Sequence, residues 1–146
     1  MLRFIDPVLS PDLLATLREM GHGDEIAIVD ANFPAETMGQ RTLRADGVPA
    51  TTLTEAILKL MPLDDFVEQS AFVMQQVHEP AVLAPICEEF EEQVKRHSQG
   101  RFGVVPVERF AFYEQAQSCF AVVQTGERRL YGCIILKKGV LRPDEG

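Results

Sequence analysis

Hydrophobic positions recur along the chain with two different periods, which predicts a mixture of helices and short strands. Apolar residues three or four apart predict helices that bury one face: residues 11–20, 53–61, 85–97 and 108–117. Short apolar runs rich in β-branched residues predict buried strands between them: residues 26–29, 71–77, 104–107, 119–124 and 131–136. The mixture predicts a layered α/β domain, whereas the order of the strands stays open.

Residues with known preferences for the ends of elements support some of these boundaries. Ser10 precedes Pro11 and Asp12, which is the pattern of an N-cap followed by the first turn of a helix. Thr52 and Glu55 match a capping box, so we expect the second helix to start there. Pro106 interrupts residues 104–107 and predicts an edge strand or a strand end.

Composition and charge exclude several classes of function. With 146 residues, of which 46% are hydrophobic, the chain suffices for one domain over residues 1–146 with its own core. A formal net charge of −8 disfavours nucleic acid and anionic membranes as partners. No segment has the length and apolarity of a membrane span, and none resembles a secretory leader, so we expect a cytoplasmic protein.

Cysteines and histidines form no recognisable metal motif. Cys87, Cys119 and Cys133 are an odd and scattered set, which predicts neither a disulfide framework nor a zinc site. We expect Cys87 and Cys119 in the core.

His22 is the first candidate for chemistry. It stands between Gly21 and Gly23, directly after a predicted helix and before the first buried strand. The glycines leave the imidazole uncovered, and loops on a rigid frame often carry functional groups. Imidazole donates and accepts protons near neutral pH, so His22 is a candidate general acid or base. The alternative is an exposed histidine without a role.

Candidate binding residues stand at the ends of other predicted elements. Asp30 ends the strand at residues 26–29, and the carboxyl ends of strands are where open α/β sheets bind ligands. Its carboxylate accepts hydrogen bonds from hydroxyl groups. The alternative is that Asp30 caps the following turn.

A helix and a strand supply further candidates. Arg109 and Tyr113 are four residues apart and share one aromatic-rich helix face, which suits a sugar with hydroxyl edges and apolar faces. An ordinary amphipathic helix is the alternative. Tyr131 offers a phenol at the start of the last predicted strand, where Gly132 permits a close approach of the backbone.

Taken together and in order, five of these segments resemble the RbsD/FucU family, from about residue 10 to residue 140. They are residues 20–25, 30–34, 44–47, 108–114 and 131–132. Arg109, followed by Phe-Ala-Phe-Tyr, is similar to the L-fucose mutarotase branch, because D-ribose pyranases usually carry a histidine there. The family usually has Tyr-Gly-Asn where this chain has Tyr131-Gly132-Cys133.

The resemblance implies a three-layer α/β/α sandwich that assembles into a ring-like homo-oligomer, often a decamer, with sites near subunit boundaries. It implies a mutarotase that interconverts the α and β anomers of a free monosaccharide, L-fucose above all, without cofactor or metal. His22 would be the general acid. The implied sugar-binding residues are Asp30, Arg109, Tyr113, Tyr131, Gly132 and Cys133.

Other functions stay open from the sequence. The chain is also compatible with pyranose–furanose interconversion of D-ribose, with a non-catalytic sugar-binding accessory of a transport system, and with a purely structural ring-forming protein. The catalytic hypothesis expects His22, Asp30 and Arg109 around one cavity, within a subunit or between subunits.

Overall fold

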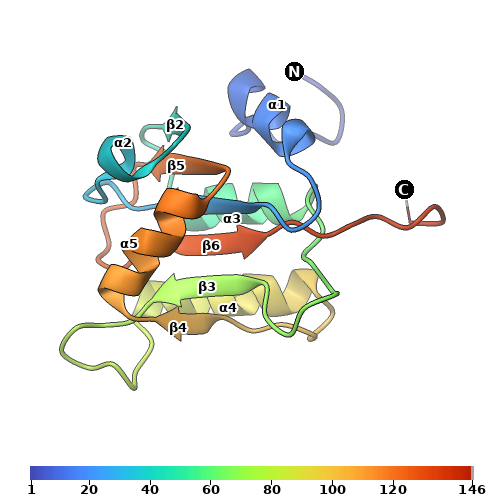
Figure 1. Cartoon of the computed structure of the whole chain (residues 1–146). Coiled ribbons are helices and arrows are strands. Elements are labelled where there is room, and N and C mark those ends of the chain that lie inside the picture. The colour runs from blue at the N-terminus through green and yellow to red at the C-terminus, as the bar shows by residue number, and fades with distance from the viewer. Residues whose placement is uncertain (146) are drawn as a thin grey trace.

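A six-stranded mixed sheet forms the centre of the molecule (Figure 1). The structure is a computed structural model that describes residues 1–145. Its strands lie in the order β2-β5-β1-β6-β3-β4 and have these bounds: β1 Glu25–Val29, β2 Thr42–Ala45, β3 Ala71–Met74, β4 Val105–Val107, β5 Ala121–Thr125 and β6 Ile134–Lys137.

The direction of the strands defines two edges of this sheet. β6 is antiparallel to its neighbours β1 and β3, whereas the other neighbouring strands pair in parallel. We call the side where β1 to β5 end, and where β6 begins, the carboxyl edge. The opposite side, where β1 to β5 begin and β6 ends, is the amino edge.

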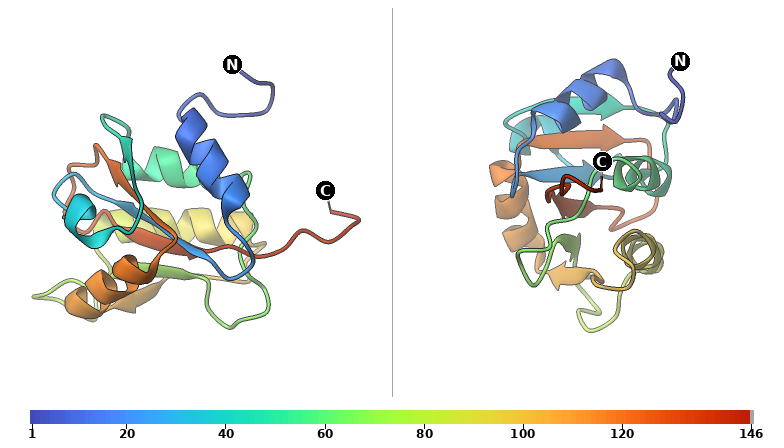
Figure 2. Two further views of the ribbon diagram at one scale, coloured as in Figure 1. Left: turned by 45° about the horizontal axis from the view of Figure 1, so that its top comes forward. Right: turned by 90° about the vertical axis from the view of Figure 1, so that its right-hand side faces the viewer.

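Helices cover both faces of the sheet, which gives the predicted three-layer α/β/α sandwich (Figure 2). Their bounds are α1 Pro11–Glu19, α2 Ala35–Met38, α3 Ala50–Leu58, α4 Pro85–His97 and α5 Arg109–Ser118. The helices α3 and α4 pack on one face, where α1 adds Leu13 and Leu17 to the same core. The other face packs against α2 and α5.

The burial of β1 explains why its sequence is continuously apolar. Ile26 and Ile28 point into the core on the α3–α4 side, and Ala27 and Val29 point into the core on the α5 side. Alternate residues of a strand face opposite sides, so a strand covered on both faces needs apolar residues throughout. Cys87 and Cys119 are buried in these two cores, as predicted.

Several boundaries confirm the predictions, and others correct them. Ser10 caps α1, since its hydroxyl accepts a hydrogen bond from the Leu13 amide, and β4 is the edge strand expected from Pro106. The capping box at Thr52 and Glu55 is wrong. The helix α3 already begins at Ala50, and Glu55 instead binds side chains of α4.

Two strands differ from the prediction by three residues at one end, and two elements escaped prediction. β3 ends at Met74 and not at residue 77, and β6 starts at Ile134 and not at residue 131. Tyr131 has a φ of +64°, a left-handed conformation that does not belong to a strand. The pattern did not reveal α2 or β2, which are both only four residues long.

Candidate functional site

A cavity of about 220 Å³ opens at the carboxyl edge of the sheet. Its walls come from the loop after β1, the end of β3, the first turns of α5 and the segment before β6. The lining residues are Asp30, Asn32, Phe33, Met74, Val77, Arg109, Tyr113, Leu130 and Tyr131. Four of the residues predicted to bind sugar therefore surround one space: Asp30, Arg109, Tyr113 and Tyr131.

Asp30 is held firmly at the floor of this cavity. It follows the last residue of β1, and its Oδ1 accepts the amide of Asn32 at 2.9 Å, which forms a tight local turn. Its Oδ2 accepts the thiol of Cys133 at 3.4 Å, and its own amide donates to the same sulfur at 3.5 Å. Both carboxylate oxygens therefore have a fixed direction.

The first turns of α5 present a cation on an aromatic surface. Glu108 caps the helix, because its carboxylate accepts the amides of Phe110 and Ala111 at 2.9 and 3.1 Å. The guanidinium of Arg109 lies 5.0 Å from the ring centre of Phe110 and 5.8 Å from that of Tyr113. These contacts restrain the guanidinium where it lines the cavity.

The turn before β6 places Tyr131 by an unusual backbone conformation. A left-handed φ costs a non-glycine residue roughly 1–2 kcal/mol, and such strain is concentrated at functional sites. The hydroxyl of Tyr131 accepts the amide of Val77 at 3.1 Å, which ties the turn to the segment after β3. A larger residue at position 132 would be crowded, because a Cβ there would lie 2.6 Å from Cγ of Glu127.

Glu127 stabilises this turn from beneath. One of its carboxylate oxygens accepts the amides of Arg128 and Arg129, both at 3.0 Å, and the guanidinium of Arg129 binds both oxygens. The hydrogen bond from the Arg129 side chain holds the pKa of Glu127 below its ordinary value. The carboxylate therefore stays ionised and keeps the turn closed at neutral pH.

Cys133 lies under the cavity and not on its wall. Its exposed fraction is only 1%, and its contact with the cavity runs through Asp30. Burial, and then the charge of Asp30, raise the pKa of this thiol well above its ordinary value. A protonated thiol donates, so Cys133 orients the carboxylate of Asp30. A direct contact of Gly132 or Cys133 with sugar stays a prediction.

His22 lies at the other end of the sheet. It precedes β1, whereas Asp30 follows it, and the five residues of this strand span about 13 Å between their first and last Cα atoms. His22 is absent from the walls of the carboxyl-edge cavity. Within one chain, the imidazole therefore does not meet Asp30 and Arg109, and the version of the hypothesis with one cavity inside a subunit is wrong.

At the amino edge, His22 has a partner that the sequence pattern did not reveal. Its Nε2 lies 2.9 Å from Oδ1 of Asp64, and its ring centre lies 5.1 Å from that of Phe66. Burial alone would raise the pKa of Asp64. The hydrogen bonds from His22 and from the Phe66 amide, with the charge of Lys137, outweigh burial and hold this pKa below its ordinary value.

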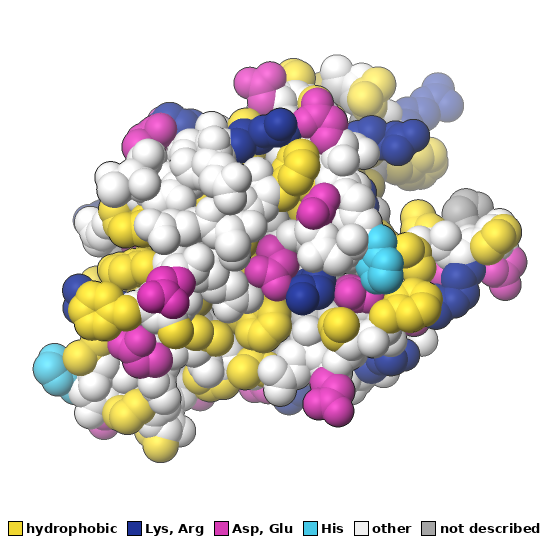
Figure 3. Space-filling view, viewed as in Figure 1, with side chains coloured by type: hydrophobic (Ala, Val, Ile, Leu, Met, Phe, Trp, Pro, Cys, Tyr) yellow, Lys and Arg dark blue, Asp and Glu magenta, His cyan; other side chains and the backbone are white. Residues whose placement is uncertain are grey.

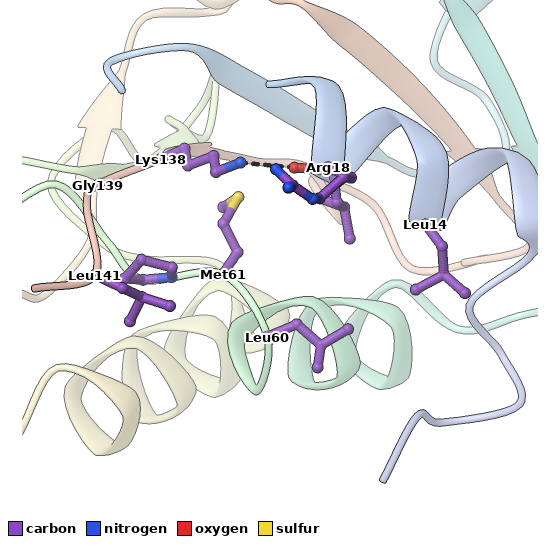
Figure 4. A pocket seen from close by; sticks show the side chains of 9 residues that line it. Leu14, Arg18, Leu60, Met61, Lys138, Gly139 and Leu141 are labelled. Carbon is purple, nitrogen blue, oxygen red and sulfur yellow. Dashed lines mark hydrogen bonds between the residues drawn. The ribbon is translucent and has the colours of Figure 1, made fainter. Parts of the chain in front are cut away.

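A second, larger cavity of about 430 Å³ lies beside α1 at the amino edge (Figure 4). Its walls are mostly apolar, with Leu14, Leu60, Met61 and Leu141 among them. The ammonium of Lys138 donates to the carbonyls of Leu17 and Met20 at the end of α1, so it is already engaged. Arg18 also lines this space, but no carboxylate is among the described residues of its walls, whereas Asp30 and Arg109 both line the carboxyl-edge cavity.

Residues 1–145 contain no group of three or more His, Cys, Asp or Glu side chains arranged to hold a metal ion. Within the same residues, no helix combines the length and the apolar character that crossing a membrane would require.

Comparison with known proteins gives concordant matches over nearly the whole chain. The model of the RbsD / FucU transport protein family matches residues 3–141. A fucose mutarotase of Danio rerio is 47% identical over 152 aligned positions, which cover 99% of this chain and 97% of that relative.

Solved structures agree. The fucose mutarotase of Streptococcus pneumoniae, in complex with L-fucose, superimposes with a TM-score of 0.89 at 40% identity, covering 97% of this chain and 100% of that one. RbsD of Bacillus subtilis, complexed with D-ribose, has a TM-score of 0.73 at 21% identity over 92% of this chain and 95% of that one. This second likeness extends to the fold alone.

Proposed function

Since this chain belongs to the RbsD/FucU family, we propose that it is an isomerase that interconverts the α and β anomers of free L-fucose. The observation that carries the proposal is sequence identity of 40–47% with fucose mutarotases over nearly the full length of the chain. One of these relatives has a solved structure with L-fucose bound. D-Ribose is the weaker candidate, because the relative with bound D-ribose is only 21% identical.

The carboxyl-edge cavity has the chemistry of a monosaccharide site. A sugar offers hydroxyl groups along its edge and apolar C–H groups on its faces. Asp30 would accept hydrogen bonds from two neighbouring hydroxyls, and Arg109 would donate to a ring or carbonyl oxygen. The rings of Phe33 and Tyr113, which pack edge to face with centres 5.3 Å apart, would contact the apolar face.

Mutarotation requires only proton transfers and one bond rotation. A base removes the proton of the anomeric hydroxyl while an acid protonates the ring oxygen, and the C1–O bond to the ring breaks. The open-chain aldehyde rotates about C1–C2, and the reverse transfers close the ring on the other carbonyl face. A well-placed acid or base accelerates such a step by about 10²–10⁴-fold. His22 is the proposed acid, with Arg109 and Tyr131 holding the open-chain oxygen.

Because His22 does not reach the cavity of its own chain, the proposed assembly would supply the histidine from a neighbouring subunit. A second copy whose amino edge meets the carboxyl edge of the first would place its His22 at the cavity. Such a head-to-tail contact uses two different surfaces and closes into a ring when the rotation permits. We therefore propose a ring-like homo-oligomer with composite sites. The decamer and the cytoplasmic location stay predictions from the sequence.

Exposed apolar side chains at both edges support this contact. Val77, Phe110 and Leu130 are exposed beside the carboxyl-edge cavity, and Phe66 and Leu141 are exposed at the amino edge. Figure 3 shows hydrophobic side chains on the surface at the left and the right of the molecule, the two ends between which the strands run. Contiguous exposed apolar surface is typical of protein–protein contacts.

NMR saturation transfer between the anomer signals of L-fucose and of D-ribose tests the activity. We expect the protein to accelerate L-fucose exchange more than D-ribose exchange. His22→Ala should lose the acceleration, by about 100-fold or more, and still bind L-fucose. The matched control is His97→Gln, because His97 has the same kind of partner, Glu55, at 2.9 Å. Wild-type exchange in His22→Ala would contradict the assignment of the acid.

Mixing two inactive variants tests the composite site. His22→Ala keeps Asp30, and Asp30→Asn keeps His22. Subunits that assemble together at random from both variants should restore about a quarter of the native sites, since a ring joins two different surfaces. A site contained in one chain would restore none. Each variant alone, taken through the same dissociation and reassembly, is the control.

A further inference from the structure

The larger cavity beside α1, which we call the amino-edge cavity, has no part in the proposed reaction. Its volume of about 430 Å³ is about twice that of the carboxyl-edge cavity, and it lies in the range of small-molecule sites. His22 is not among the residues that line it. Leu17 and Met61 are buried in its walls, whereas Leu60 and Leu141 stay exposed there. An occupant would therefore remove apolar surface from water.

Two cations face this space from different elements. Arg18 belongs to α1, and Lys138 follows the end of β6. Figure 4 shows the guanidinium of Arg18 beside the ammonium of Lys138. No Asp or Glu is among the described residues of the cavity walls, although the chain as a whole has a net charge of −8. The cavity therefore combines apolar walls with a local excess of positive charge.

The ammonium of Lys138 retains capacity for a further acceptor. It has three hydrogens and donates to two carbonyls, those of Leu17 and Met20. These two bonds also offset the negative end of α1, which would otherwise repel an anion. Burial, and then the charge of Arg18, lower the pKa of Lys138, and the charge of Asp24 only partly offsets this. A bound anion would thus relieve the repulsion between the two cations.

We propose that the amino-edge cavity binds an amphiphilic anion, a carboxylate with a hydrocarbon tail. Arg18 and Lys138 would donate to the carboxylate, and such charge-assisted hydrogen bonds are stronger than neutral ones. The tail would lie against Leu60, Met61 and the other apolar walls. This site is separate from the proposed sugar site and does not depend on the proposed function.

Charge also decides between this ligand and a peptide segment of the chain itself. Residues 1–4 carry three exposed apolar side chains and are the nearest competitor in apolar character. They also include Arg3, which would bring a third positive charge to Arg18 and Lys138. Like charges in one site repel each other, whereas a carboxylate matches the two cations.

Two methionines report on the two cavities separately, because Met61 lines the amino-edge cavity and Met74 lines the carboxyl-edge cavity. The probe is octanoate, titrated into the assembled wild-type protein while the ¹³C-methyl NMR signals of methionine are recorded. Octanoate should shift the signal of Met61 more than that of Met74, and L-fucose should do the reverse. Octan-1-ol lacks the charge and acetate lacks the tail, so both should bind at least about tenfold more weakly than octanoate.

A pair of arginine variants tests the role of the cations. Arg18→Gln should weaken octanoate binding about fivefold or more, because it removes a charged donor from the site. Arg3→Gln is the matched control, since it makes the same change of charge at an exposed residue outside the cavity walls. It should keep the wild-type affinity for octanoate. Equal weakening in both variants would mean that only the net charge matters and would overturn the inference.

The wild-type titration decides the question even without these variants. Equal affinities for octanoate and octan-1-ol would overturn the inference, because the cations would then have no part in binding. An unchanged Met61 signal would overturn it too, and a change of that signal on dissociation of the assembly would identify a second copy as the occupant. Failure of the proposed function would appear separately, as a wild-type protein that binds octanoate but accelerates no anomer exchange.

Discussion

Replacing Cys133 tests how the floor of the carboxyl-edge cavity is held together. The sulfur is buried, accepts the Asp30 amide and donates to the Asp30 carboxylate. In Cys133→Ala, loss of one buried heavy atom costs about 0.8 kcal/mol. The Asp30 amide, left without an acceptor, adds about 1–2 kcal/mol. We therefore expect a destabilisation of about 2–3 kcal/mol, which lowers Tm by roughly 4–10 °C for a chain of this size.

The same change should weaken sugar binding, because Oδ2 of Asp30 loses the donor that orients it. We expect KM for L-fucose to rise several-fold and kcat to change less, since Cys133 is remote from His22 of its own chain. Cys133→Ser is the matched variant, because its hydroxyl also donates and accepts. Cys133→Ser should show less than half of the decrease in Tm that Cys133→Ala shows, and it should keep most of the affinity for L-fucose.

Calorimetry at fixed protein concentration gives Tm, and NMR anomer exchange at varied L-fucose concentration gives KM. The fixed concentration matters because the proposed assembly would stabilise the folded chain by mass action. If the Ala and Ser variants had the same KM, the thiol would merely fill space. The proposed role of Cys133 in orienting Asp30 would then be refuted.

Two further predictions concern the carboxylates and the turn before β6. Asp64 and Glu127 have pKa values below their ordinary ones in the folded chain. The stability they contribute is therefore complete above the unfolded values of about 4 and is lost as pH falls through the lower folded values. Thermal unfolding should show a steep loss of Tm below about pH 4, and this dependence of Tm on pH should be weaker in Glu127→Gln. If the slope of Tm against pH were unchanged in Glu127→Gln, the proposed contribution of Glu127 to acid unfolding would be refuted. Gly132→Ala should destabilise by about 1–3 kcal/mol through crowding, because its Cβ would lie 2.6 Å from Cγ of Glu127. Gly21→Ala, whose Cβ meets nothing closer than 3.6 Å, is the control, and equal denaturant midpoints for the two variants would contradict the packing argument.

The hydrophobic pattern predicted those elements whose burial it reflects directly. β1 was predictable because both of its faces are covered, so every residue from Ile26 to Val29 is apolar. β2 was not, because it is an edge strand whose residues are half-buried or exposed, with Arg44 on the solvent side. The left-handed turn at Tyr131 was hidden for another reason. A tyrosine before an apolar run is typical of a strand start. The contacts that hold Tyr131 in the turn include residues far away in the sequence: its hydroxyl accepts the Val77 amide, and its carbonyl accepts the Cys87 thiol.

The residues of the candidate site also differ in whether the sequence pattern could predict them. Asp30 was predictable from its place at the end of β1, because ligands bind at the carboxyl ends of strands. Asp64 was not predictable. It stands 42 residues after His22 in a segment without a motif, and the two meet only because β1 and β3 both pair with β6. Contacts that depend on strand order are invisible to a pattern that leaves strand order open.

In the proposed reaction, the groups at the two ends of β1 have complementary parts. The carboxyl edge has the groups that are proposed to bind the sugar and to hold its open form, but it lacks His22 of its own chain. The amino edge has a histidine with a fixed carboxylate partner, beside a cavity that is largely apolar. Neither edge performs the acid–base step alone, because proton transfer requires hydrogen-bond distance between the acid and the ring oxygen. A rigid strand cannot bring its own ends together, so the proposed catalysis requires a second subunit, and activity should depend on assembly even where sugar binding does not.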